Sequence, residues 1–257
     1  MAKLTISPES PPPLPFGCQI SSILNIMPEN DMPDHRADPR GPSFLSRFRD
    51  TASHPEKEAL ARLVSSTAFD PGQPIFVASG TTTFIIAKHL LSEIRGAQIW
   101  TNSAPLLYAF LEMQDSDQLA PHVQLGVVRG EVNPTTGIVS SSPLGKLPTH
   151  TLLYAPHGLS SRGIVGRRDI RDIKAIISAH RDIVMPLTWD KIFREAPNVI
   201  KHLGHAEKEI QQGKRSYHIL LPPIEPELTT VHGPIREKLT FLDSLQAAGF
   251  RVTFGSR

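Results

Sequence analysis

The stretch IFVASGTTTFIIAKHL, residues 75–90, passes from an apolar run through a glycine and three threonines into a helix-patterned segment. A strand that delivers hydroxyls and backbone N–H groups to a helix start is the usual geometry for holding a phosphate. The same residues could instead cap the helix, because threonine or serine at such a junction accepts a helix N–H. Which role applies depends on the fold that surrounds the stretch.

Apolar runs alternate with amphipathic segments along the chain, which predicts an α/β fold. Strands are expected over residues 75–79, 97–101, 122–128, 149–156, 182–187, 217–222 and 251–255, and helices over 54–68, 84–91, 104–113, 168–180, 198–213 and 234–249. Residues 129–139 have the turn residues of an inserted β-hairpin, and residues 157–166 are expected to form a loop. We therefore expect a mainly parallel, Rossmann-like sheet covered by helices on both faces, with ligand groups at the carboxyl ends of its strands.

Composition limits the function classes. The 257 residues are 39% hydrophobic and carry a net charge of +2, which provides a core but no broad field for polyanions. The lone Cys18 permits no internal disulfide and no cysteine-built zinc site, which fits a reducing compartment. The N-terminus lacks the apolar region of a signal peptide, and no apolar run is long enough to cross a membrane. We expect a soluble, cytoplasmic protein without cofactor or metal.

Residues 1–53 differ in composition from the rest. Nine of the 24 prolines lie within the first 50 residues, and proline both fixes φ and removes a backbone donor. This predicts a proline-rich, extended N-terminal tail over residues 1–53 and an α/β domain over residues 54–257. The tail is either a linker or an arm that contacts a second subunit or a partner protein, with FLSRFR, residues 44–49, as the expected contact.

The order of motifs in residues 54–255 resembles the DeoR-type effector domain, the sugar-phosphate-sensing half of a group of bacterial repressors. The resemblance is carried by EKEALARL, GQPIF, SGTTT, TNS, GEV, HG followed by a later glycine, IKAIISAH and DIVMPLTWDKI, in that order. It implies a fold shared with ribose-phosphate isomerase and glucosamine-phosphate deaminase, in which the loop after an early strand holds the phosphate of a sugar.

The resemblance also implies a set of ligand-binding residues. Those expected to hold the phosphate are Ser79, Gly80, Thr81, Thr82 and Thr83, and those expected to approach the sugar are Asn102, Ser103, Gly130, Glu131, His157, Gly158 and Lys191. Other interpretations remain open for several of them. The TNS segment could cap the following helix, Glu131 could be a solvated turn residue, and His157 could be structural.

The sequence departs from the family pattern where carboxylates are expected. Ala78 precedes the threonine motif, Thr188 stands three residues before Lys191, and Pro222 with Pro223 follows a late strand. Residues 1–53 are also too proline-rich for a winged helix-turn-helix, so no direct DNA binding is expected.

These departures favour a non-catalytic sensor of a phosphorylated metabolite that acts through a partner or an oligomer. The alternatives are a sugar-phosphate isomerase or deaminase that uses Glu131, His157 and Lys191, and an interaction scaffold whose pocket has decayed.

Overall fold

The computed structural model describes residues 54–70, 72–134, 136–140, 147–166, 170–224 and 235–256, so the expected N-terminal tail lies outside the described residues. The helices are α2 (Pro55–Thr67), α3 (Thr81–Glu93), α4 (Ala104–Asp115), α5 (Ile170–Ala179), α6 (Leu203–Gln211), α8 (Ile235–Ala247) and the 3-10 turn η3 (Trp189–Lys191). Within these ranges, no helix is long and apolar enough to cross a membrane.

Seven strands form the main sheet, and all of its strand pairs are parallel. They are β1 (Ile75–Val77), β2 (Gln98–Thr101), β3 (Gln124–Val127), β6 (Thr151–Leu153), β9 (Asp182–Pro186), β11 (Ser216–Leu221) and β12 (Arg251–Phe254). Their spatial order is β12-β11-β9-β6-β1-β2-β3. The chain builds outward from β1 to β3, then returns to the other side of β1 and builds outward from β6 to β12. The order therefore reverses between β1 and β6, which makes this pair the topological switch point of the sheet.

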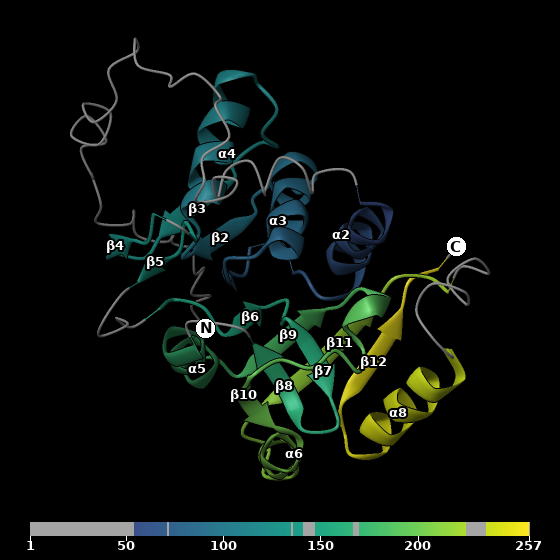
Figure 1. Cartoon of the computed structure of the whole chain (residues 1–257). Coiled ribbons are helices and arrows are strands. Elements are labelled where there is room, and N and C mark those ends of the chain that lie inside the picture. The colour runs from purple at the N-terminus through teal and green to yellow at the C-terminus, as the bar shows by residue number, and fades with distance from the viewer. Residues whose placement is uncertain are drawn as a thin grey trace, which may run out of the picture. The chain divides into compact units, whose positions relative to one another are not determined.

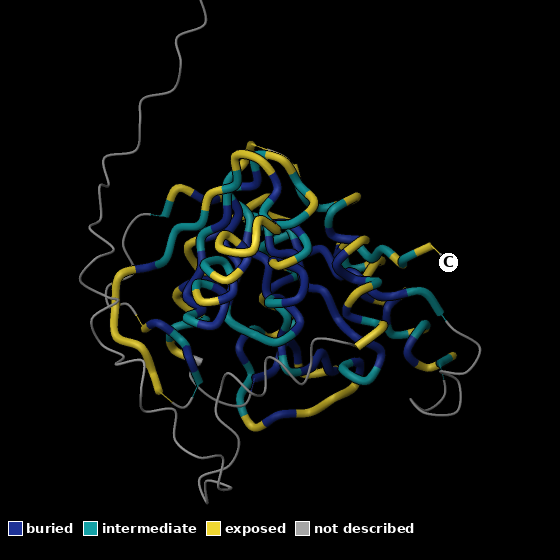
Figure 2. The backbone as a smooth tube through the Cα atoms, turned by 90° about the horizontal axis from the view of Figure 1, so that it is seen from above, coloured by how far each residue is buried: buried dark blue, intermediate teal, exposed yellow. Residues whose placement is uncertain are grey.

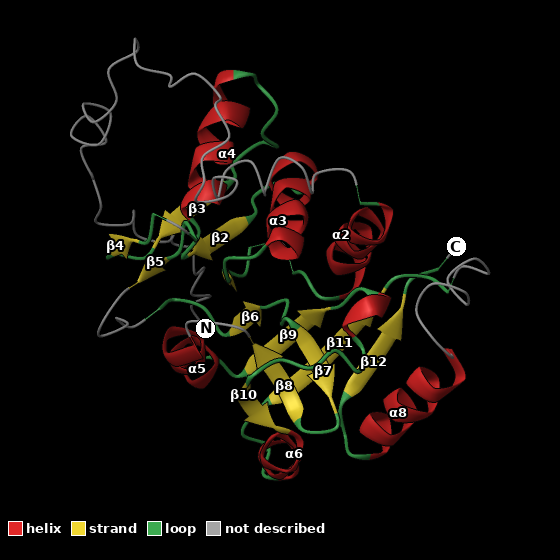
Figure 3. Cartoon of the chain, viewed as in Figure 1, coloured by secondary structure: helices red, strands yellow, loops and turns green. Residues whose placement is uncertain are grey.

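Helices cover both faces of this sheet, as the sequence predicted (Figures 1 and 3). Side chains alternate between faces along each strand. Ile75 and Val77 belong to the core cluster shared with α2, α3 and α4, whereas Phe76 belongs to the cluster shared with α5, α6 and α8. Figure 2 shows buried segments along the inner elements and exposed segments at turns and outer helix surfaces.

The inserted hairpin is also confirmed, because β4 (Glu131–Val132) and β5 (Val139–Ser140) pair in antiparallel fashion. Two other predictions were wrong. The expected loop 157–166 contains β7 (Gly158–Ser160) and β8 (Gly163–Gly166), and the expected helix over 198–213 begins with β10 (Asn198–His202). These strands form a second, antiparallel sheet of order β10-β8-β7. The pairing of β8 with β10 is a long-range contact that local periodicity does not report.

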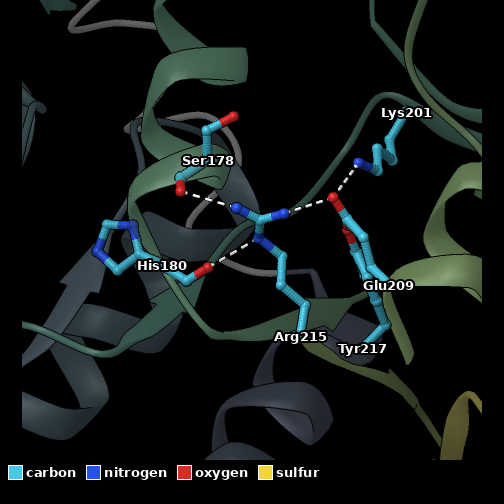
Figure 4. A network of polar contacts seen from close by, with 6 residues as sticks. All are labelled: Ser178, His180, Lys201, Glu209, Arg215 and Tyr217. Atoms are coloured by element: carbon cyan, nitrogen blue, oxygen red, sulfur yellow. Dashed lines mark hydrogen bonds and ion pairs between the residues drawn. The ribbon is translucent and has the colours of Figure 1, made fainter. Parts of the chain in front are cut away.

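A network of polar contacts around Glu209 ties α6 to β10 and β11 (Figure 4). The Glu209 carboxylate accepts hydrogen bonds from Lys201 at 2.6 Å, Arg215 at 2.5 Å and the Tyr217 hydroxyl at 2.8 Å. Arg215 also donates to the carbonyl oxygens of Ser178 and His180, at 2.8 and 3.0 Å, which adds the end of α5 to the network. Charge-assisted bonds of this kind are stronger than neutral ones, so the network fixes these elements against each other.

Candidate functional site

The stretch that links β1 to α3 builds one wall of the site. Gly80 is the N-cap of α3, with no side-chain cap, and its carbonyl accepts the Phe84 N–H at 2.8 Å. Thr83 is buried, and its hydroxyl donates to the carbonyls of Ala78 at 2.6 Å and Gly80 at 2.9 Å. Thr83 therefore stabilises the turn itself. Thr81 and Thr82, in contrast, line a cavity in front of the helix start.

This cavity has a volume of about 310 Å³ and is lined by Thr81, Thr82, Ala155, Pro156, His157, Lys191 and Arg194. We call it the switch-point cavity, because its residues follow the carboxyl ends of β1 and β6, between which the strand order reverses, and of β9. Open α/β sheets bind ligands outside the carboxyl ends of their strands at such a reversal. The volume lies at the lower end of the range for small-molecule sites. The volume of the cavity and its position at the strand-order reversal both suit a small ligand.

Lys191 joins two walls of the cavity. Its ammonium donates a hydrogen bond of 3.3 Å to the Thr82 hydroxyl. Desolvation by burial lowers the pKa of Lys191 to about 8; the nearby cations Lys57 and Arg194 act in the same direction, and the carboxylates of Asp190 and Glu56 oppose it. Because burial and the neighbouring cations together outweigh the two carboxylates, an arriving anion would stabilise the charged form of Lys191.

The turn that carries Lys191 is held from two helices. The Trp189 N–H donates to Glu56 Oε2 of α2 at 3.3 Å, and Lys238 Nζ of α8 donates to the Trp189 carbonyl at 2.8 Å. Trp189 itself is fully buried and stacks on Phe254, with ring centroids 6.0 Å apart. The backbone of η3 is therefore fixed on both sides before any ligand arrives, as a binding site with a defined geometry requires.

Arg194 reaches the cavity from the segment after η3. Its guanidinium forms an ion pair with Asp190, at 2.8 Å, and the Asp190 carboxylate also accepts the Thr188 hydroxyl at 2.5 Å. The Arg194 carbonyl packs against Gly158, where an added Cβ would lie 2.2 Å from that oxygen. Gly158 thus allows the backbone of residue 194 to approach the strand that begins just after His157.

Positive charge is concentrated around the cavity. Burial lowers the pKa of both Lys57 and Lys238, and the carboxylates of Asp190 and Glu56 raise it in each case. Lys57 is 8% exposed and Lys238 6% exposed, so both ammonium groups lie within the protein near the same two carboxylates. Together with Lys191 and Arg194, these lysines surround the two carboxylates with an excess of cationic groups. These four cationic side chains outnumber the two carboxylates, and such an excess of positive charge favours anions.

The structure brings together only part of the predicted set. Thr81, Thr82, His157 and Lys191 line the cavity, and Ser79 lies beside them with its N–H donating to Asn102 Oδ1 at 2.8 Å. Gly80, Thr83 and Gly158 shape the backbone of the site. Ser103 caps α4 by accepting the Leu106 N–H at 3.4 Å. Gly130 and Glu131 are exposed at the β4–β5 hairpin.

Three lining residues were missed by the sequence analysis, namely Ala155, Pro156 and Arg194. Ala155 and Pro156 carry no polar side chain, so no chemical signal identifies them. Arg194 was detectable, because it is a cation three residues after Lys191 in a segment that follows a strand. Lys57 and Lys238 lie in helices and look like solvated helix residues in the sequence.

His202 and His205 are three positions apart in the sequence and could share a metal ion only with a further ligand. The rings of His202 and His205 lie 5.6 Å apart in an edge-to-face arrangement at the start of α6. Among the residues that the structure describes, no group of three or more His, Cys, Asp or Glu residues is placed to hold a metal ion. The pair is therefore a contact between two exposed rings.

No family model matches this amino-acid sequence, and no curated protein matches it. A functional assignment therefore depends on the geometry of the switch-point cavity and on the residues that line it.

Proposed function

We propose that this protein binds a phosphorylated sugar or a related phosphorylated metabolite, as the resemblance to DeoR-type effector domains implies, in the switch-point cavity. In this proposal the protein is a non-catalytic, cytoplasmic sensor that passes the bound state to a partner protein or to a second subunit. The observation that carries the proposal is the meeting of the α3 start, Lys191 and Arg194 around one cavity at the strand-order reversal.

A phosphate has complementary partners at this place. The first N–H groups of a helix lack intrahelical acceptors and point toward an anion placed at its start, where the helix dipole also favours negative charge. The Gly80 N-cap provides no side chain that would occupy this place. Thr82 contributes a hydroxyl and Lys191 an ammonium, and both groups can donate to phosphate oxygens.

The alternative of an isomerase or deaminase fits the geometry less well. Such chemistry needs a base within hydrogen-bond reach of the carbon-bound proton that it removes. Glu131, the carboxylate considered for this role, is exposed in β4, whereas the cavity is lined from the segments after β1, β6 and β9. His157 and Lys191 do line the cavity, and they suit the recognition of an anion as well as proton transfer. A binding function therefore explains the lining of the cavity without assigning a catalytic role to any of its residues.

The experiment is a calorimetric titration of the purified full chain with inorganic phosphate, ribose 5-phosphate and glucosamine 6-phosphate. Thr82→Val and Lys191→Met should weaken the binding of every compound that binds, by about tenfold each, since each loses a donor to a charged group. Thr240→Val is the matched control, because Thr240 is exposed on α8. The proposal fails if no phosphorylated compound binds, or if the two cavity variants bind as the wild type does.

A further inference from the structure

Two cationic side chains, Lys191 and Arg194, line the switch-point cavity. Lys191 lies beside Thr82 at the start of α3, where its ammonium donates to the Thr82 hydroxyl. Arg194 follows η3, and its guanidinium forms an ion pair with Asp190. We propose that the ligand carries two anionic groups: a phosphate at Lys191 and a second anion, a carboxylate or another phosphate, at Arg194. This inference rests on the proposed function and narrows its ligand class.

Arg194 is suited to a second anion. Its guanidinium carries five N–H donors in a fixed fork, and its ion pair with Asp190 is made through one terminal nitrogen, Nη2. The side chain is 40% exposed, so the rest of the fork remains accessible to a ligand. Arginine is the residue that best matches the two oxygens of a carboxylate or a phosphate. A ligand anion would therefore meet a group that is already oriented by Asp190.

The cavity lining is less suited to a phosphorylated compound whose other polar groups are all hydroxyls. Recognition of sugar hydroxyls relies mainly on acceptors such as carboxylates. The charged side chains that line the cavity, Lys191 and Arg194, are both cations. The carboxylate of Asp190 beside them already accepts from Thr188 and Arg194. The charged groups of the lining are therefore donors, which favours a second anionic group over a polyol chain.

The two anions must lie close together, because both cations line one cavity and Arg194 acts on the charge of Lys191. At about 310 Å³, the cavity suits a small ligand rather than a nucleotide. A phosphorylated three-carbon acid meets both conditions, because its phosphate and carboxylate are separated by a short chain. Pyrophosphate offers the same pair of charges without a carbon skeleton and so tests whether the second anion can be a phosphate.

The test compares 3-phosphoglycerate with glycerol 3-phosphate, which have the same three-carbon skeleton and differ in a carboxylate against a hydroxymethyl group. Calorimetry on the wild type should show the carboxylate compound binding about tenfold more tightly, as expected for a charge-assisted contact. Arg194→Gln should reduce this preference to less than about threefold, because it weakens the binding of 3-phosphoglycerate more than that of glycerol 3-phosphate. Arg194→Lys, which keeps the charge and loses the fork, should retain an intermediate preference.

Arg162→Gln is the matched control, because Arg162 forms an exposed ion pair with Glu195 and does not line the cavity. It should leave both affinities as in the wild type. In a parallel titration, tighter binding of pyrophosphate than of inorganic phosphate would show that the second anion can be a phosphate. Equal affinity for the two three-carbon compounds, or a preference that survives in Arg194→Gln, would overturn the two-anion inference and leave the proposed function standing. Failure of both compounds and of both inorganic anions to bind would overturn the proposed function as well.

Discussion

The Lys191 ammonium lies 3.3 Å from the Thr82 hydroxyl, although 109 positions separate the two residues in the sequence. The contact joins the turn after β9 to the first turn of α3, across the strands β6 and β1. Burial of the Lys191 ammonium costs more than its neighbours return, since its pKa is lowered although the carboxylates of Asp190 and Glu56 act in the opposite direction. We therefore expect Lys191 to favour the binding of an anion and to lower the stability of the ligand-free protein.

We expect Lys191→Met to stabilise the ligand-free protein at pH 7 by about 1–3 kcal/mol, because a desolvated charge is replaced by an apolar side chain of similar length. The pKa of Lys191 falls from 10.5 to about 8 on folding. Between these pH values the unfolded chain retains a proton that the folded chain has lost, so this residue makes wild-type stability rise with pH. Urea unfolding at pH 7, 8.5 and 10 measures the difference between wild type and variant, which should shrink as the pH increases.

Lys174→Met is the control, because Lys174 is exposed on α5. Its unfolding free energy should follow the wild type across the same pH values. A constant gap between wild type and Lys191→Met would contradict the assigned pKa shift.

Gly158→Ala should destabilise the fold by about 1–3 kcal/mol, as overpacking in a closely packed interior does. The added Cβ would lie 2.2 Å from the Arg194 carbonyl oxygen, and backbone cannot move aside as a flexible side chain can. Gly204 in α6 provides the contrast, since an added Cβ there meets nothing within 4 Å. Gly204→Ala should leave stability unchanged or raise it by up to about 1 kcal/mol. Equal effects of the two substitutions in urea unfolding would refute the packing role of Gly158.

His218 should make the protein sensitive to acid. It is 5% exposed in β11 and shares a hydrogen bond of 2.9 Å with Thr253 Oγ1. Burial, helped by the Arg251 charge, lowers the pKa of His218 to about 4. The unfolded chain binds a proton below about pH 6.5 while the folded chain stays neutral, so stability falls as the pH decreases from 6.5 to 4.

We expect His218 to account for about 2–3 kcal/mol of this loss. His218→Gln, which keeps a hydrogen-bonding side chain, should reduce the acid slope, whereas His205→Gln, at an exposed position of α6, should not. Thermal unfolding from pH 7 to pH 4 distinguishes the variants. An unchanged slope in His218→Gln would assign the acid sensitivity to other groups, such as His180, whose pKa is also lowered by burial.

Glu209→Gln should destabilise the protein by about 1–3 kcal/mol, because Lys201 and Arg215 would keep their charges and lose the carboxylate between them. Burial raises the pKa of Glu209, but hydrogen bonds from Lys201 and Tyr217 outweigh this effect, so the pKa lies below its usual value. Glu195→Gln is the comparison, since the Arg162–Glu195 pair is exposed and such pairs contribute little. Urea unfolding should show a clear loss for the first variant and little change for the second.

Local pattern was sufficient for much of the fold. The apolar run of β1 and the helical spacing of α3 are visible in residues 75–90, and the alternation of strands and helices predicts the parallel sheet. Local pattern failed where short strands pair with segments that are distant in the sequence. Residues 157–166 contain three glycines, which predicted a loop, yet β8 lies within them and pairs with β10. The residues of β10 were predicted to begin a helix.

By itself, the sequence determined the strands of the main sheet and the helices that cover it, because periodicity is a property of neighbouring residues. It also identified the α3 start, His157 and Lys191 as candidates for binding. Only the tertiary structure decided that Thr82, His157, Lys191 and Arg194 share one cavity while Glu131 lies on an exposed hairpin. The physical reason is that strand order sets which carboxyl ends become neighbours, and strand order depends on packing between segments far apart in the chain.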